Sequence, residues 1–169
     1  MQNTTALGLY SLDYSDWRTY KTALFLVIAN VIFPQIFHYF GTGAVWLPIY
    51  FFTLVGSYKY GWKVGLLTAI FSPLTSHFLF GMPAGIMLPV VMSRSAVLAL
   101  VAGVVSAHFQ KATLPLFALV VLCSFLLGGI PDLLIRGDLT HAWQTQLAGW
   151  PGMLLQIFGG YLVVNLGKD

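Results

Sequence analysis

The fold is decided by residues 72–95, which read SPLTSHFLFGMPAGIMLPVVMSRS. This stretch contains the end of one hydrophobic segment, a break over residues 81–85, and a second hydrophobic segment that Pro89 opens and that carries Arg94. A guanidinium within hydrocarbon costs between ~2.5 and ~17 kcal/mol, so it is tolerated only where it faces protein, water or an anion. Arg94 is therefore the first candidate for a functional residue.

The composition of the 169-residue chain is that of a membrane protein. Hydrophobic residues make up 58% of it and charged residues 8%, whereas a soluble domain has about 25% charged residues. At ~20 residues per crossing, about six helices fit in this length. We predict an all-α integral membrane protein with an N-terminal cytoplasmic segment over residues 1–16 and a single domain of six transmembrane helices over residues 17–169.

Hydrophobic runs bounded by glycine, proline and polar turns predict where the spans lie. We expect them over residues 17–39, 44–58, 62–80, from the 81–85 break to about 107, 113–134 and 150–166. Small residues recur every fourth position along the fourth span, which predicts a face for close helix packing: Ser95, Ala99, Gly103 and Ala107. In the first span, Asn30 and Gln35 are expected to make hydrogen bonds between helices.

The cations predict the orientation of these spans. Arg94 lies inside the bundle, Arg136 lies on one side, and six cations lie on the other: Arg18, Lys21, Lys59, Lys63, Lys111 and Lys168. The positive-inside rule then puts both termini in the cytoplasm, and the five tryptophans fall at predicted span ends, where indole rings are enriched. The residues with unusual chemistry gather near the three outward connections: His38, His77, Pro83, Pro89, Arg94, Asp132, Arg136, Asp138 and His141. We expect an outward-opening pocket in the inner (cytoplasmic) membrane of the cell.

Two hypotheses for Arg94 remain open at this point. Its guanidinium either binds a carboxylate or phosphate through paired hydrogen bonds, or forms an internal ion pair, most plausibly with Asp132. His77, near the outer face, is a hydrogen-bond partner, a metal ligand that His38 could join, or a structural histidine. Two distant histidines without Cys or Glu are a poor metal signature, so neither a metal nor a cofactor is expected.

Several short stretches occur together here as they do in one transporter family. They are residues 65–74 (GLLTAIFSPL), 80–83 (FGMP), the small-residue fourth span, and 151–156 (PGMLLQ). With these stretches, its small size and its six spans, the chain resembles the substrate-binding S components of energy-coupling factor (ECF) vitamin transporters. The resemblance covers about residues 22–166. It implies capture of a vitamin or cofactor precursor at the outer face, followed by docking onto a transmembrane coupling subunit driven by two cytoplasmic ATPases.

The resemblance also implies which residues line the substrate pocket. They come from the outward connections and from the helix ends beside them: His38, His77, Phe80, Met82, Met87, Arg94, Asp132, Arg136, Trp143 and Trp150. The expected partners are thus a small vitamin, the coupling module and the lipid bilayer. No nucleic acid is expected, because the sequence contains no basic patch.

One departure from the family pattern keeps an alternative open. Family members often carry small residues four apart on the first span for docking to the coupling subunit, and here only Thr19 and Ala23 fit that spacing. A solitary S-component-like carrier is therefore the alternative. We do not expect an enzyme, because the chain has no Glu, no phosphate-binding loop and no Gly-x-Ser-x-Gly or His-Glu-x-x-His motif. An intramembrane enzyme and a membrane scaffold are the less favoured classes.

Overall fold

Six helical segments make up the part of the chain that the computed structural model describes, which is residues 11–39, 48–137, 144 and 147–166. Within these ranges the structure is all-α, as the sequence predicts. The elements are α1 (Trp17–Tyr39), η1 (Pro48–Tyr50) with α3 (Phe51–Tyr60), α4 (Trp62–Phe80), α5 (Leu88–Phe109), α6 (Leu114–Arg136), and a last segment of α8 (Trp150–Leu154), η2 (Leu155–Gly159) and α9 (Gly160–Leu166).

The helix boundaries lie close to the glycine, proline and polar turns of the sequence. α1, α4 and the last segment match the predicted spans residue for residue, and α3, α5 and α6 end two residues beyond the predicted ends. The predicted start of the second span, residue 44, lies outside the described residues. α4 ends at Gly81, whose φ of 68° is left-handed and whose N–H donates to His77 O at 2.8 Å. Glycine adopts this conformation without the steric penalty that a Cβ brings.

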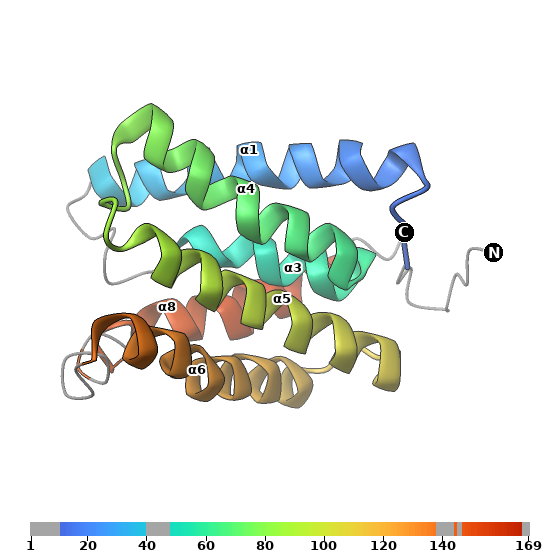
Figure 1. Cartoon of the computed structure of the whole chain (residues 1–169). Coiled ribbons are helices and arrows are strands. Elements are labelled where there is room, and N and C mark those ends of the chain that lie inside the picture. Colours follow the sequence, from blue (N-terminus) through green and yellow to red (C-terminus); the bar gives the residue numbers. More distant parts are fainter. Residues whose placement is uncertain (1–10, 40–47, 138–143, 145–146, 167–169) are drawn as a thin grey trace.

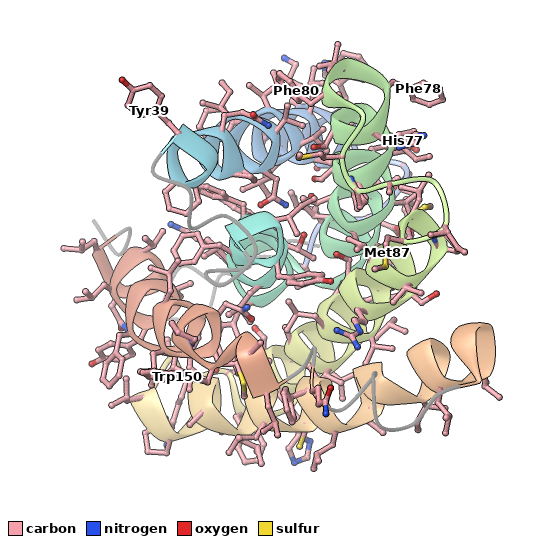
Figure 2. The ribbon with its side chains drawn as sticks, turned by 90° about the vertical axis from the view of Figure 1, so that its left-hand side faces the viewer. Tyr39, His77, Phe78, Phe80, Met87 and Trp150 are labelled. Carbon is pink, nitrogen blue, oxygen red and sulfur yellow. The ribbon has the colours of Figure 1, made fainter. Side chains whose placement is uncertain are left out.

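The helices alternate in direction around α3, so that successive connections lie at opposite ends of the bundle (Figure 1). The α4–α5 connection and the start of α8 lie at one end, and the start of α1 lies at the other (Figure 1). Viewed along the bundle, α3 is central and the other helices surround it (Figure 2). Seven of its ten residues are buried, from Phe51 to Tyr58.

The core is built on aromatic and aliphatic contacts with α3. The Tyr58 ring stacks on Phe117 of α6, with centroids 4.4 Å apart. Gly160 permits α9 to approach this pair, because a Cβ there would lie 3.1 Å from Phe117. The last segment therefore packs directly on the centre of the bundle.

The small-residue face of α5 is a packing surface, as predicted. Ser95, Ala99 and Gly103 are buried. A Cβ on Gly103 would lie 2.4 to 2.8 Å from Cβ, Cα and N of Trp62, at the start of α4. Ala107, at the end of the stripe, is exposed. Gly103 thus allows the backbones of α4 and α5 to meet.

Asn30 joins three helices, which confirms the predicted interhelical role. Its side chain is fully buried. Nδ2 donates to Thr53 Oγ1 at 3.0 Å and to Ser72 Oγ at 3.2 Å, and Oδ1 accepts the Phe52 N–H at 3.1 Å. This N–H belongs to the first turn of α3, where backbone donors have no partner within the helix.

Replacing Asn30 with Leu is expected to destabilise the protein by roughly 2 kcal/mol, since each of its three hydrogen bonds contributes about 0.6 kcal/mol in a membrane protein. Thermal unfolding of the purified protein in detergent measures the change. Asn165→Leu is the control, because its amide donates at 2.8 Å to Tyr161 O in its own helix and makes one longer contact, at 3.5 Å, with Ala112 O before α6. Equal losses in the two variants would contradict the joining role of Asn30.

The N-terminal segment docks on the turn between α3 and α4. The Leu12 N–H donates to Tyr60 O at 3.2 Å, and Leu12 is buried. Asp13 pairs with Lys63, whose Nζ lies 5.3 Å from the centre of the Tyr14 ring. The hydrogen bond and charge of Lys63 lower the pKa of Asp13 below its ordinary value of 3.8.

This pair is expected to make a small contribution to stability that depends on pH. Because the pKa of Asp13 is lowered in the folded protein, the contribution is complete above pH 3.8 and is lost as the pH falls through the lowered pKa. A melting-temperature series across this acid range, compared with that of Lys63→Gln, measures it. Parallel curves for the two proteins would contradict the pairing.

Two of the described helices, α4 and α5, are long and apolar enough to cross a membrane. The apolar helical stretches Leu114–Ile130 and Trp150–Leu166 are shorter than α4 and α5. In the second segment the structure describes only residues 48–60, which at 1.5 Å per residue span about 20 Å as a helix. The six-span topology therefore stays a prediction.

Candidate functional site

A small cavity lies between α5, α6 and the last helical segment, with Tyr50 before α3 completing its wall. Its volume is about 60 Å³. The lining combines one cation with three other polar side chains and an apolar remainder: Arg94, Tyr50, Ser124, Gln156, Leu98, Val121, Phe125, Gly128 and Met153. Of the residues that the sequence singles out for binding and whose side chains the structure describes, Arg94 lines this cavity.

Arg94 and Gln156 enter the cavity at a similar depth. Each lies six residues after the start of its helical segment, which is about 9 Å along the helix axis. Both segments start at the end of the bundle where α4 and α5 are connected (Figure 1). The cavity therefore lies in the half of the bundle that the cation distribution assigns to the outside.

Gly128 provides the space in which the Arg94 side chain lies. A Cβ at Gly128 would come 3.4 Å from Arg94 Cγ, so the stem of Arg94 rests against the α6 backbone. Arg94 is half-buried. The aliphatic stem is thus held by packing, and the guanidinium stays at the cavity.

Gln156 and Ser124 supply further polar groups to the cavity. Gln156 is buried and belongs to the π-helical turn η2; such turns are rare and frequently occur at functional sites. Ser124 Oγ is buried and has no hydrogen-bond partner among the described residues. A buried hydroxyl without a partner costs about 1 to 3 kcal/mol, so a polar guest that bonds to it is stabilised.

The volume limits what the cavity encloses. A space of about 60 Å³ holds a few water molecules or one carboxylate-sized group, whereas pockets that enclose a drug-sized ligand measure ~300 to ~1,000 Å³. The arrangement is suited to hold the charged end of a ligand, with Arg94 as cation and Gln156 and Ser124 as hydrogen-bonding groups. A large ring system needs an opening of the outer end.

The predicted site residues at the α4–α5 connection form a separate group. His77 Nδ1 lies 2.7 Å from Pro83 O, which ties the end of α4 to the connection. Met87 immediately precedes α5 and lies on the same side of the bundle as His77 (Figure 2). The hydrogen bond accounts for His77 as a residue that fixes the connection.

Other predicted site residues lie at the periphery. Phe80 is 47%, Met82 50% and Trp150 61% exposed. Trp150 lies on the opposite side of the bundle from His77 (Figure 2). The remaining predictions fall outside what the structure describes: Trp143 as a whole, and the side chains of His38, Asp132 and Arg136. The ion pair between Arg94 and Asp132 therefore stays a prediction.

Sequence reasoning missed Tyr50, Ser124 and Gln156 as cavity residues. A signal for two of them was present. Gln156 is the one amide in the apolar run WPGMLLQIFGG, and Ser124 is one of the few hydroxyls in its own apolar run, four residues before Gly128. An isolated polar residue in a predicted span points to protein or to a cavity.

The comparisons with known proteins find no matching family model, no matching curated protein and no matching solved structure.

Proposed function

We propose that this chain is a multi-pass membrane protein that captures a small organic anion from the outer side, as the substrate-binding subunit of an importer of the energy-coupling factor type. The proposal is carried by one observation. Arg94 lies on a helix apolar enough to cross a membrane and lines a cavity with Gln156 and Ser124. A cation in such a helix faces protein, water or a partner, and here it faces a space with further hydrogen-bonding groups.

The outer surface of the bundle supports the membrane placement. Large apolar side chains are more than half exposed on several helices, among them Leu24 and Phe25 of α1, Val104 of α5, Leu126 of α6 and Leu162 of α9. Soluble monomers rarely expose apolar patches of more than a few hundred Å². Lipid is the solvent that suits this surface.

The chemistry of the cavity supports an anionic cargo. Arginine presents a planar fork of donors that matches a carboxylate in two parallel hydrogen bonds. The apolar walls, among them Leu98, Val121 and Phe125, suit the hydrocarbon part next to such a group. Small carboxylate-bearing vitamins and cofactor precursors combine these two features.

A second candidate function, a solitary carrier without the standard coupling module, is favoured by the burial of the first helix. Thr19 and Ala23 are the pair with the spacing expected for docking. They are 0% and 5% exposed within the chain itself. A pair covered by its own chain offers a coupling subunit little surface.

The experiment that tests capture is identification of a co-purified small molecule. The protein is purified from cells grown in rich medium and then denatured, and the released compounds are identified by mass spectrometry. We expect an anionic vitamin or precursor in a near one-to-one ratio with protein. A correctly folded protein that releases only lipid, and that binds none of the candidate carboxylates added afterwards, would contradict capture. Co-purification of the two ATPases separates the importer subunit from the solitary carrier.

A further inference from the structure

A second hollow lies on the exterior of the helical bundle, between α1 and α4. These two helices run side by side in the same direction (Figure 1). The hollow has a volume of about 270 Å³. Its lining is apolar except for the hydroxyl groups of Tyr20 and Thr75, and the other lining residues are Ala23, Leu24, Val27, Leu67 and Phe71. Ala23 and Val27 are buried, whereas Leu24 and Phe71 are 61% and 52% exposed. The hollow is therefore a groove with a floor of small side chains and walls of large ones.

The length of the groove matches one leaflet of a bilayer. It extends from Tyr20 to Val27 on α1 and from Leu67 to Thr75 on α4, which is about 10 to 12 Å along the helix axes. One leaflet contributes about half of the ~30 Å hydrocarbon core. Tyr20 lies three residues from the start of α1, and the α4 lining extends from Leu67 to Thr75, just past the middle of α4. The groove therefore runs from near the end of the bundle that the cations assign to the cytoplasm to about its middle.

The end of the groove near Tyr20 is basic and aromatic. Lys21 is exposed, and its Nζ lies 5.9 Å from the centre of the Trp17 ring. The two carboxylates nearby have partners within the protein. Asp13 pairs with Lys63, and Asp16 Oδ1 accepts the backbone N–H of Arg18 at 2.9 Å. Lys63 balances the charge of Asp13, and Lys21 with Arg18 outweighs the single charge of Asp16, so this end of the protein carries a net positive charge.

We infer that the α1–α4 groove binds one acyl chain of an anionic phospholipid of the cytoplasmic leaflet, with the lipid phosphate held at Lys21, which directly follows the lining residue Tyr20. A membrane helix of a partner is less suited to this groove, because such a helix is 10–12 Å across and the floor lies between the projecting side chains of Leu24 and Phe71. This inference rests on the membrane placement proposed above and is independent of cargo capture.

The test is lipid binding by the delipidated full-length protein, measured by native mass spectrometry. Phosphatidylglycerol and phosphatidylcholine with identical acyl chains are titrated separately. We expect one phosphatidylglycerol to bind more tightly than any phosphatidylcholine. Lys21→Gln is expected to weaken it about fivefold, since a lysine near the membrane surface contributes about 1 kcal/mol toward anionic lipid. Lys111→Gln removes a cation from the same end of the bundle, away from the groove, and is expected to leave binding unchanged.

Groove variants test the acyl-chain part of the inference. Ala23→Phe fills the floor and is expected to abolish the tight phosphatidylglycerol site, and Val104→Phe is the control at an exposed position on α5. Phe71→Ala removes an exposed wall of the groove and is also expected to weaken phosphatidylglycerol binding. It replaces Ala23→Phe as the test variant if Ala23→Phe does not fold. Equal binding of the two lipids, or equal behaviour of groove variants and controls, would overturn the inference. Either result leaves the release of a vitamin, the test of capture, unaffected.

Discussion

Arg94→Ala is expected to lower the affinity for the proposed anionic cargo by about thirtyfold or more. Removing one member of a buried, hydrogen-bonded charge pair costs about 2 to 5 kcal/mol, and each 1.4 kcal/mol is tenfold in affinity. The measurement is isothermal titration of the purified protein with the compound that the wild type releases. Arg94→Lys keeps the charge but loses the planar fork, so we expect an intermediate affinity. Arg18→Ala is the matched control, because it removes an arginine from the opposite end of the bundle.

The ion-pair hypothesis predicts a different outcome for the same variant. If Arg94 serves only to pair with Asp132, Arg94→Ala is expected to lose folded protein, and additional replacement of Asp132 is expected to restore it. Recovery of folded protein with full affinity in that double variant would contradict a binding role for Arg94.

Filling the cavity provides a second test that keeps the charge. A Cβ on Gly128 lies 3.4 Å from Arg94 Cγ, so Gly128→Ala needs only a small adjustment. Gly128→Leu places a branched side chain in a cavity of about 60 Å³ and is expected to abolish binding. Equal affinities in these two variants would show that the ligand is bound elsewhere.

Gly103→Leu is expected to reduce stability by about 3 kcal/mol or more, because overpacking costs about 1 to 3 kcal/mol and more where backbone must move. The nearest atoms to a Cβ at this position include N and Cα of Trp62, at 2.8 and 2.7 Å. These are backbone atoms, which do not rotate away as a flexible side chain does. Since the total stability of a protein is about 5 to 15 kcal/mol, we expect a large fall in melting temperature and in the yield of monodisperse protein.

Ala107→Leu is the matched control for this prediction. Ala107 lies one turn further along the same stripe of α5 but is exposed. We therefore expect little change in melting temperature. If Gly103→Leu and Ala107→Leu both have the melting temperature of the wild type, the close approach of α4 and α5 at Gly103 is contradicted.

The helix boundaries and the packing face of α5 were readable from the sequence because they depend on local chemistry. Gly81 and Gly137 end helices through left-handed conformations that glycine adopts readily. Pro115 follows the first residue of α6, where its missing N–H has no cost. Small residues four apart lie on one face of any helix, so the spacing places Ala99 and Gly103 on a common face, and the structure shows that this face is buried at both positions.

The cavity was not readable in the same way. Arg94 stood out because a cation in an apolar run is costly, whereas His77 and Trp150 were selected for their place near the outer end. The structure puts Arg94 beside Ser124 and Gln156, which lie 30 and 62 positions further along the chain. Such neighbours depend on which helices are adjacent and how each is rotated, and the apolar periodicity of a span that is hydrophobic on every side does not reveal either.

The sequence by itself determined that the described part of this chain is helical, where most of its helices begin and end to within two residues, and that Arg94 requires a partner or a polar space, because these properties arise from backbone conformation and from the transfer of each residue out of water. Only the tertiary structure decided that α3 is the central helix, that Asn30 joins α1 to α3 and α4, and that the polar space at Arg94 is completed by Tyr50, Ser124 and Gln156. Those features arise from contacts between residues far apart in the chain, which local chemistry does not specify.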